Sequence, residues 1–338
     1  MIMGSAKICV VIPNWNGKDR IGACLDSVLG QSLKPIIIVV ENGSVDGSLA
    51  FLRTHYPSVE LVVNQKNLGF AGGVNGGIRL AKQLGAQYVA LLNDDALVHK
   101  DWLRQLATAL DKNPELGAAA SKLLSADKKR IDSTGDFYST WGLPFNRQRD
   151  EPASQAIDKP GFVFGPCAGA ALYRMTMFDA VGLFDEDFFA YHEDADLHFR
   201  MQLSGWKAWY VPSAEVYHQI GATSGKIKGF TTYQTFKNYP WLFWKNVPLR
   251  LLPGIFIRFK FVYFTIYISS LVGGRGWPAT KGFLRMLTLF PKKLVQRHHI
   301  QKNRKVSIDY INSILIHDLP PNATKLRRLR AAFVKKNQ

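Results

Sequence analysis

Short apolar runs alternate with helical patterns of apolar positions over the first 120 residues of the chain. Runs with few polar residues are typical of strands buried on both faces, and such strands separated by helices predict a parallel sheet covered by helices. The predicted strands lie at residues 7–13, 36–41, 59–63 and 88–92, and the predicted helices at residues 19–30, 70–85 and 101–112.

Polar residues follow three of these predicted strands, at residues 13–17, 41–46 and 93–95. Because ligands of a parallel α/β sheet bind beyond the carboxyl ends of its strands, these segments are the first candidates for a binding site. Residues 121–165 are rich in turn formers and aromatic residues and predict an irregular excursion over that site. Sheet structure is expected to resume at residues 167–174.

The composition indicates a globular protein with a basic appendage. The 338 residues are 47% hydrophobic and 20% charged, which excludes a disordered chain and allows one large α/β domain with an addition or two domains. Residues 1–225 hold 21 Lys and Arg against 24 Asp and Glu, whereas residues 226–338 hold 22 against 2. The net charge of +17 therefore comes from the last third, and we divide the chain at residue 225.

Cysteine usage and the N-terminus both suit a protein of the cytoplasm. The three cysteines, Cys9, Cys24 and Cys167, have neither metal-site nor disulfide spacing. The apolar stretch near the N-terminus is broken by Pro13 and Asn14 after a few residues, as in a buried strand and unlike a signal peptide. We expect the protein to stay on the cytoplasmic side.

The segment LLNDDALV (91–98) places two adjacent carboxylates, Asp94 and Asp95, where a buried strand emerges. Adjacent acids repel each other, and a divalent cation would compensate them, since Mg²⁺ and Mn²⁺ prefer carboxylate and phosphate oxygens and need few protein ligands. The simpler alternative is a solvated turn that caps the next helix. His218, at the end of a strand-like run, is a candidate ligand only together with these acids.

Two further segments have residues suited to a nucleotide. VVENGSVDGS (39–48) carries Glu41, Asn42 and Ser44 after a strand; these side chains can hydrogen-bond a base and a ribose, but an ordinary turn and helix cap explains them too. NLGFAGGVNGGI (67–78) offers glycines for close backbone approach and helix amides for a phosphate, but glycines at a helix–sheet contact explain it equally. Neither segment is a Walker loop or a dinucleotide fingerprint.

A third group of acids, Glu193, Asp194 and Asp196, opens a predicted helix behind the aromatic segment 188–191. Acids in a first helical turn favour the helix dipole, which is the simpler explanation. The aromatic flank would also reduce hydration and raise the pKa of a carboxyl group toward that of a general base. Asp196 and Arg200 are four residues apart and can pair on the helix, which leaves Asp194 as the candidate reactive group.

The order of these segments resembles the family 2 glycosyltransferases with the GT-A fold, especially their rhamnosyltransferase-like bacterial members. The resemblance implies a Rossmann-like, mixed and mostly parallel sheet flanked by helices, in which residues 1–120 bind a nucleotide-sugar and residues 121–225 bind the acceptor. The segments that carry it are VVIPNWNG, VVENGSVDGS, NLGFAGGVN, LLNDDALV, GAALYR, FDEDFFAYHEDADLHFR and VYHQIGATSG.

The resemblance also implies roles for individual residues. Asp194 matches the catalytic base, Asp95 the metal-coordinating acid of an Asp-X-Asp-type motif, and His218 a further contact to the metal or the diphosphate. Asn42 and its neighbours would contact the base of the nucleotide, and Asp94 would lie near the ribose. The residues expected to bind the nucleotide-sugar are Pro13, Asn16, Glu41, Asn42, Ser44, Asn67, Gly69, Phe70, Asn75 and Asp94.

The implied reaction is a single displacement with inversion, in which Mg²⁺ or Mn²⁺ stabilises the leaving diphosphate and a general base deprotonates the acceptor hydroxyl. The best single expectation is rhamnose from dTDP-rhamnose, moved to a lipid-linked (polyprenyl diphosphate) glycan in cell-surface polysaccharide synthesis. Glu41 stands where the family usually has Asp, which leaves the base open. A nucleotidyltransferase and a non-catalytic, membrane-bound sugar-binding scaffold are the alternatives.

Residues 239–274 are apolar and aromatic but also contain Lys and Arg. Their longest uncharged run, residues 261–274, has 14 residues, short of the roughly 20 that a spanning helix needs. This mixture favours a helix in the interface of an anionic membrane, so that residues 226–338 form a basic helical region that holds the protein on the inner membrane. A pair of core helices and a dimer interface are the alternatives for this segment, so the oligomeric state stays open. A nucleic-acid partner is not expected, because the sequence contains no nucleic-acid-binding motif.

Overall fold

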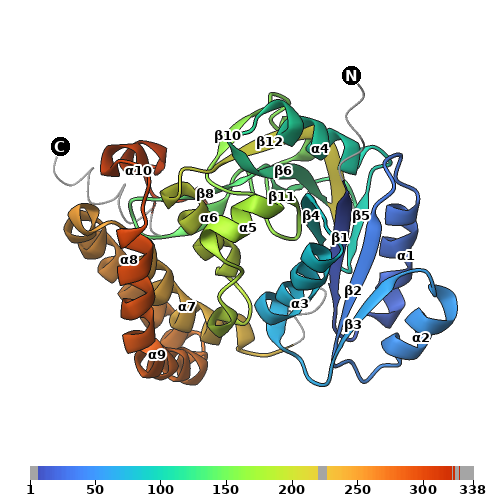
Figure 1. Cartoon of the computed structure of the whole chain (residues 1–338). Helices are drawn as coiled ribbons and strands as arrows, with labels where there is room; N and C mark the ends of the chain where they lie inside the picture. The colour runs from blue at the N-terminus through green and yellow to red at the C-terminus, as the bar shows by residue number, and fades with distance from the viewer. Residues whose placement is uncertain (1–6, 220–226, 322, 324–326, 328–338) are drawn as a thin grey trace.

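The computed structural model describes residues 7–219, 227–321, 323 and 327 and is built around one mixed β-sheet (Figure 1). Its strands are β1 (Ile8–Asn14), β2 (Ile36–Asn42), β3 (Glu60–Asn64), β4 (Tyr88–Leu92), β5 (Ala96–Val98), β6 (Leu116–Ser125), β7 (Ile131–Ser133), β10 (Gly161–Val163), β11 (Ala170–Arg174) and β12 (Lys207–His218). The order across the sheet is β10-β12-β6-β11-β4-β1-β2-β3, with β5 beside β12 and β7 beside β6.

The four strands predicted from the first 120 residues form a parallel unit, β4-β1-β2-β3, with bounds that differ from the predicted ones by one residue at most. Alternate residues of β1 enter two cores. Val10 and Ile12 pack with α1 (Lys18–Leu29) and α4 (Trp102–Lys112), whereas Cys9 and Val11 pack with α3 (Gly69–Gln83) on the other face. Helices therefore cover both faces, as predicted. The short helix α2 (Ser48–His55) was not predicted.

The second half of the sheet is mixed. β11, where sheet structure was expected to resume, pairs antiparallel with both β4 and β6. The predicted irregular excursion is only partly irregular, because residues 121–125 complete β6, which runs parallel to β12. The rest includes a small hairpin of β8 (Asp136–Tyr138) and β9 (Pro144–Asn146) and the short helix η1 (Ala153–Gln155).

Helices α5 (Met175–Val181) and α6 (Glu193–Leu203) follow β11, and the C-terminal helices pack beside α6 (Figure 1). The latter are α7 (Phe230–Asn246), η4 (Leu249–Leu251), α8 (Leu252–Val272), α9 (Gly276–Lys302) and α10 (Ile308–Ile314).

Helix α7 is a core helix. Trp241, Leu242 and Phe243 are fully buried in one cluster with Phe199 of α6. Residues 239–246, the first part of the segment expected in a membrane interface, therefore belong to the core, as one alternative had it. The predicted division between residues 225 and 226 lies outside the described residues.

Candidate functional site

A cavity of about 590 Å³ lies beyond the carboxyl ends of β1, β2 and β4, the edge of the sheet at which the sequence predicts a site. Its volume is in the range of pockets that hold a small ligand. Both halves of the sheet contribute to its wall, and Ile227 and Phe230, at the start of α7, contribute as well. The predicted site residues that line it are Pro13, Asn42, Asn67, Gly69, Phe70, Asp94, Asp95, Asp194 and His218.

Three other predicted nucleotide-binding residues lie behind this wall and connect two turns. The carboxylate of Glu41 accepts hydrogen bonds from Asn14 Nδ2 (2.6 Å) and from the Ser44 N–H (2.7 Å). Ser44 Oγ in turn accepts from the N–H of Asn16 (2.9 Å). The network fixes the turn after β2 against the turn after β1, so that Glu41 acts on the shape of the cavity from inside the protein.

Two predicted asparagines use their amide groups to brace the cavity. Asn42 Nδ2 donates to Asn67 Oδ1 (3.1 Å) and to the Gly69 carbonyl (3.0 Å), which holds the entry of α3 close to the end of β2. Asn75 is buried and exchanges two hydrogen bonds with the backbone of Phe184 (2.9 and 3.0 Å). Asn42 still reaches the cavity, whereas Asn75 is not among the residues that line it.

Asp94 forms a two-bond ion pair with Arg20 of α1. Arg20 Nε lies 3.0 Å from Asp94 Oδ1, and Arg20 Nη2 lies 2.9 Å from Oδ2. Burial raises the pKa of Asp94 to about 6, although Arg20 acts in the opposite direction. Sequence reasoning missed Arg20, because nothing in a helix pattern marks one arginine as the partner of an acid 74 residues later.

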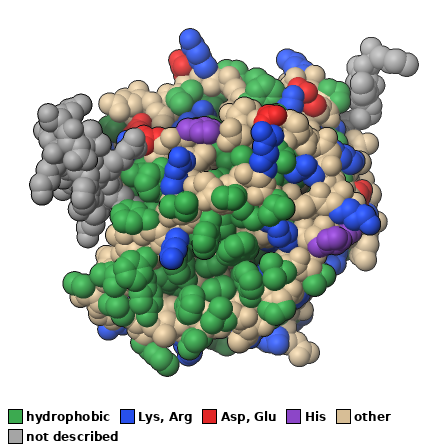
Figure 2. Space-filling view, turned by 90° about the vertical axis from the view of Figure 1, so that its left-hand side faces the viewer, with side chains coloured by type: hydrophobic (Ala, Val, Ile, Leu, Met, Phe, Trp, Pro, Cys, Tyr) green, Lys and Arg blue, Asp and Glu red, His purple; other side chains and the backbone are tan. Residues whose placement is uncertain are grey.

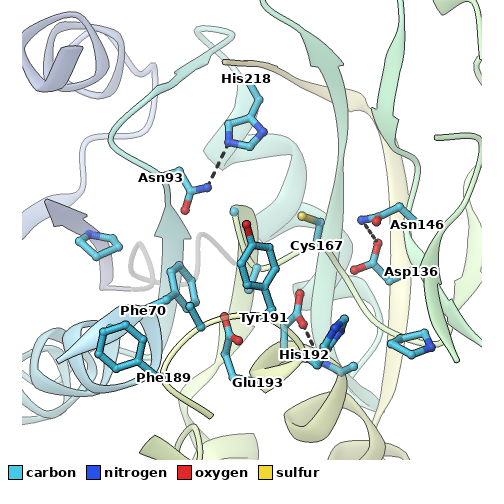
Figure 3. Close-up of a pocket in the computed structure, with 18 of the residues that line it drawn as sticks. Phe70, Asn93, Asp136, Asn146, Cys167, Phe189, Tyr191, His192, Glu193 and His218 are labelled. Carbon is cyan, nitrogen blue, oxygen red and sulfur yellow. Dashed lines mark hydrogen bonds between the residues drawn. The ribbon is translucent and has the colours of Figure 1, made fainter. Parts of the chain in front are cut away.

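Asp95 lies beside His218, whose other ring nitrogen is held by a second acid. His218 Nε2 lies 3.1 Å from Asp95 Oδ1 and 3.1 Å from Asn93 Nδ2 (Figure 3), and its Nδ1 lies 2.7 Å from Asp132 Oδ2. Asp132 also pairs with Arg149. Burial alone would lower the pKa of His218, but its bonds to Asp132 and Asp95 raise it to about 10. Asp132 thereby fixes the ring with Nε2 toward Asp95.

The chemistry of Asp95 and His218 fits a divalent cation. A carboxylate oxygen and an imidazole nitrogen converge on the cavity. Mn²⁺ or Mg²⁺ would accept such a pair by displacing the proton that the raised pKa leaves on His218, when phosphate oxygens and water complete the shell. Over the described residues, no group of three or more His, Cys, Asp or Glu side chains could hold a metal ion by itself. A cation at this place would therefore depend on oxygens of its ligand.

The segment before α6 has an unusual backbone. Phe189, Tyr191 and His192 all have positive φ, at 65°, 67° and 70°. A non-glycine residue in this region costs about 1–3 kcal/mol and persists only where its surroundings hold it. All three residues line the cavity, and Figure 3 shows Phe189, Tyr191 and His192 around it. The strained segment thus forms the wall next to the acids of α6.

Helix α7 supplies the contacts that hold this segment. Asn238 Nδ2 lies 2.8–3.0 Å from the carbonyl oxygens of Phe188, Ala190 and Tyr191. Lys237 Nζ adds a hydrogen bond of 3.1 Å to the Phe188 carbonyl. Sequence reasoning missed both α7 residues, because side chains that bind backbone carbonyls 47 to 50 residues away leave no spacing signal.

Two partly buried carboxyl groups face the cavity near these residues. Asp194 Oδ1 accepts the N–H of Ala195 (2.7 Å), and burial raises its pKa. Asp136 of β8 accepts from Ser133 Oγ (2.8 Å) and Asn146 Nδ2 (2.9 Å; Figure 3), and burial and the charge of Asp194 raise its pKa. No ion pair of Asp194 is found in the part of the chain that the structure describes. Sequence reasoning missed Asp136, a lone acid in an irregular region.

The ion pair predicted within α6 is confirmed. Asp196 is fully buried, and Arg200 Nε lies 2.9 Å from its Oδ2. Lys245 and Asn246 of α7 also bind this carboxylate, at 2.9 and 2.8 Å. Burial would raise the pKa of Asp196, but Lys245 and Arg200 lower it. Asp196 therefore joins α6 to α7 and leaves the cavity to Asp194.

Comparison with known proteins gives consistent results for sequence and fold. The family model "Glycosyl transferase family 2" matches residues 9–182. N-acetylglucosaminyl-diphospho-decaprenol L-rhamnosyltransferase of Mycobacterium tuberculosis is 29% identical over 246 residues, which are 64% of this chain and 77% of the relative. Galactofuranosyltransferase GlfT1 of Mycolicibacterium smegmatis is 25% identical over 286 residues, which are 80% of this chain and 93% of the relative.

A solved structure shares the fold. The mannosyltransferase of Pyrobaculum calidifontis in complex with GDP-Man and Mn²⁺ matches with a TM-score of 0.53 at 14% identity, over 87% of this chain and 84% of that chain. The expected fold class, a mixed and mostly parallel sheet of the GT-A type flanked by helices, is thereby confirmed.

Proposed function

Because the chain belongs to glycosyltransferase family 2, we propose that it is a metal-dependent, inverting enzyme that moves a sugar from a nucleoside-diphosphate donor to a hydroxyl of a lipid-linked glycan. The observation that carries the proposal is the placement of Asp194 and the pair Asp95–His218 in one cavity beyond the strand ends. A carboxylate for which the described residues offer no ion pair, and a pair that would bind a cation, are the two groups that a single displacement requires.

The reaction assigns each device a role. Asp194 takes the proton of the acceptor hydroxyl. At the same time the hydroxyl oxygen attacks the anomeric carbon of the sugar, and the bond between that carbon and the diphosphate breaks. The raised pKa of Asp194 suits a general base, since it brings the group closer to neutral pH. Asp95 and His218 would hold Mg²⁺ or Mn²⁺, which supplies charge neutralisation at the diphosphate.

The donor site would lie along the parallel strands. Pro13, Asn42 and Phe70 line the cavity there and are our candidates for contacts to the nucleotide. Four further predicted residues would act indirectly, by fixing the turns and the helix that present those side chains: Glu41, Ser44, Asn16 and Asn75. Arg20 would also act indirectly, since it fixes Asp94 near the ribose.

The relatives support the choice of substrates to be tested first. One is named as a rhamnosyltransferase that uses a decaprenol-linked substrate, and another as a galactofuranosyltransferase. We therefore propose rhamnose from dTDP-rhamnose as the first donor and a polyprenyl-diphosphate-linked glycan as the acceptor. An acceptor of this kind would place the protein peripherally on the cytoplasmic side of the inner membrane, against anionic lipid.

A donor panel tests this proposal. Nucleoside-diphosphate sugars, including dTDP-rhamnose and an activated galactofuranose, are incubated with Mn²⁺ or Mg²⁺ and a polyprenyl-diphosphate-linked acceptor, and released diphosphate and glycosylated product are measured. We expect Asp194→Asn to lose transfer by about 10²-fold or more and to keep nucleotide binding. Asp95→Ala should weaken metal-dependent nucleotide binding instead.

The matched control for Asp194→Asn is Asp179→Asn, an exposed acid on α5 that pairs with Lys82. It should transfer sugar as the wild-type protein does. Normal transfer by Asp194→Asn would exclude Asp194 as the base, and release of pyrophosphate in place of a nucleoside diphosphate would indicate a nucleotidyltransferase.

A further inference from the structure

Helix α8 is apolar on two opposite faces. Leu252, Ile255, Phe259 and Val262 are buried and pack into the protein. A surface helix normally turns polar side chains outward, but the outer face of α8 does not. Five of its exposed apolar residues recur every three or four positions, with exposed fractions from 42% to 72%: Ile257, Phe261, Phe264, Ile268 and Leu271.

Helix α9 continues this exposed apolar surface. Trp277 is 69% exposed, and Leu284, Leu287 and Leu294 are about half exposed. α8 and α9 pack against each other, and Figure 2 shows hydrophobic side chains gathered over the side of the molecule on which both helices lie. We call these nine residues, five on α8 and four on α9, the α8–α9 face. An exposed apolar patch of this extent marks a binding surface.

The charge around the α8–α9 face has one sign. Neither α8 nor α9 contains an Asp or Glu, and Figure 2 shows Lys and Arg side chains among the hydrophobic ones. Lys260 on α8, Arg275 just before α9, and Lys281 and Arg285 on α9 are exposed. Apolar side chains flanked by cations match an anionic lipid surface. A second copy of the chain on the same face would bring like charges together, so lipid fits better than self-association.

The contacts of α8 favour a helix in the plane of the membrane. The segment Leu249–Val272 is long and apolar enough to span a bilayer by length and composition. However, Arg258 Nη1 donates to Thr140 Oγ1 (3.0 Å) and Tyr263 Oη donates to the Phe236 carbonyl (2.9 Å). A spanning orientation would break these bonds and expose the buried face of α8. Helices that lie in the interface keep one face on the protein and place the other in lipid.

The α8–α9 face also has a structural link to the cavity. Leu143, in the loop between β8 and β9, packs with Val262 of α8, whereas Pro144 and Phe145 of β9 line the cavity. The same short hairpin therefore contacts both α8 and the site.

We infer that the α8–α9 face docks the protein on an anionic bilayer, with α8 and α9 parallel to the membrane and their outer apolar side chains among the lipids. The inference deepens the proposed function, since a lipid-linked acceptor would reach Asp194 from this side, but binding to lipid does not require that function to be correct.

Vesicle flotation with the full chain tests the inference without donor or acceptor. Wild-type protein should float with vesicles of phosphatidylcholine and phosphatidylglycerol, and more weakly with phosphatidylcholine alone or at high salt. Phe261→Ser combined with Phe264→Ser should weaken binding by about tenfold or more, since two rings leave the lipid. The matched control is Phe162→Ser on β10 of the central sheet. Phe162 is 54% exposed, and this variant should bind vesicles as the wild type does.

A charge variant covers the case in which the double Phe variant does not fold. Lys260→Gln with Lys281→Gln should reduce binding to the anionic vesicles and leave the weak binding to phosphatidylcholine unchanged. Wild-type protein that stays off anionic vesicles, or variants that bind like the wild type, would overturn the inference. A dimer that light scattering detects and that the Phe changes dissociate, without vesicle binding, would assign the face to a second copy. Lipid binding without sugar transfer would overturn only the proposed function.

Discussion

The acids at the start of α6 differ in what surrounds them. Asp196 binds two cations and an amide, so its charge is compensated inside the protein. Glu193 is also buried, but its Oε2 has no hydrogen-bond partner among the described residues, and Figure 3 shows the carboxyl group between Phe70 and Tyr191. Burial and then the charge of Asp194 raise the pKa of Glu193 to about 8. At neutral pH, Glu193 is therefore a protonated acid beside the proposed base.

The protonation of Glu193 predicts a pH-dependent effect of Glu193→Gln. The folded protein keeps this proton up to about pH 8, whereas the unfolded chain loses it near 4.5. Folding therefore takes up a proton between these values, and the wild type loses stability as the pH rises through this window. Gln cannot ionise, so the stability of the variant relative to the wild type should rise by roughly 3–4 kcal/mol between about pH 5 and about pH 8.

Urea unfolding across that pH range measures the difference in the free energy of unfolding. Glu60→Gln, an exposed position on β3, is the control and should track the wild type at every pH. Parallel curves for Glu193→Gln and the wild type would show that Glu193 is already ionised in the folded state.

At this scale, the sequence predicts the acids better than their partners. Asp95 and His218 could be found because one follows a buried strand and the other ends one, which brings them to the same edge of the sheet. Asp132 and Arg149, which orient His218, come from a region without periodicity. Their contact with His218 depends on tertiary packing, and no local pattern encodes it.

At the scale of elements, α7 and the strained segment before α6 depend on each other. One amide group, that of Asn238, serves three carbonyls of that segment. Asn238→Ala should destabilise the protein by about 1–3 kcal/mol, because it removes the side-chain donor from the partly buried carbonyls of Ala190 and Tyr191. It should also lower the transfer rate more than it raises the KM for the donor, since Asp194 follows directly on the released segment.

Thermal unfolding and steady-state kinetics check this expectation. Asn303→Ala, an exposed residue after the end of α9, is the control that should change neither quantity. A variant Asn238→Ala with wild-type stability and kinetics would show that the segment keeps its conformation without α7.

The accuracy of the predicted elements follows their hydrophobic pattern. β1 to β4 are continuous apolar runs and were predicted to within one residue, but β8 and β9 are three residues each, too short for a period to show. The hydrophobic pattern of segment 239–274 also does not show which part of the segment is buried in the core and which part is exposed. Its first part is core and its second part has an exposed outer face, because apolar composition is the same for a residue packed on protein and for one that faces lipid.

At the scale of the molecule, residues on both sides of the predicted division share one core. Tyr138, Phe188 and Phe199 pack in the same cluster as Trp241 and Phe243. Buried charges cross the division as well: Asp185 Oδ2 lies 2.6 Å from Lys245 Nζ and 2.7 Å from Lys293 Nζ. Burial would raise the pKa of Asp185, but the two lysines lower it well below its usual range.

This shared core predicts that residues 1–225 do not fold alone. Without the C-terminal helices, Phe188 loses Trp241, Asp185 loses both Lys245 and Lys293, and Asp196 keeps Arg200 but loses Lys245. The apolar surface that α7 covers would then face water, which removes the stabilisation from its burial. We expect the fragment to aggregate or to lack near-UV dichroism and a cooperative thermal transition. A chain that ends at residue 321 keeps all these partners and should melt like the full protein. A cooperative transition of the 1–225 fragment would instead make the two regions independent domains that only touch.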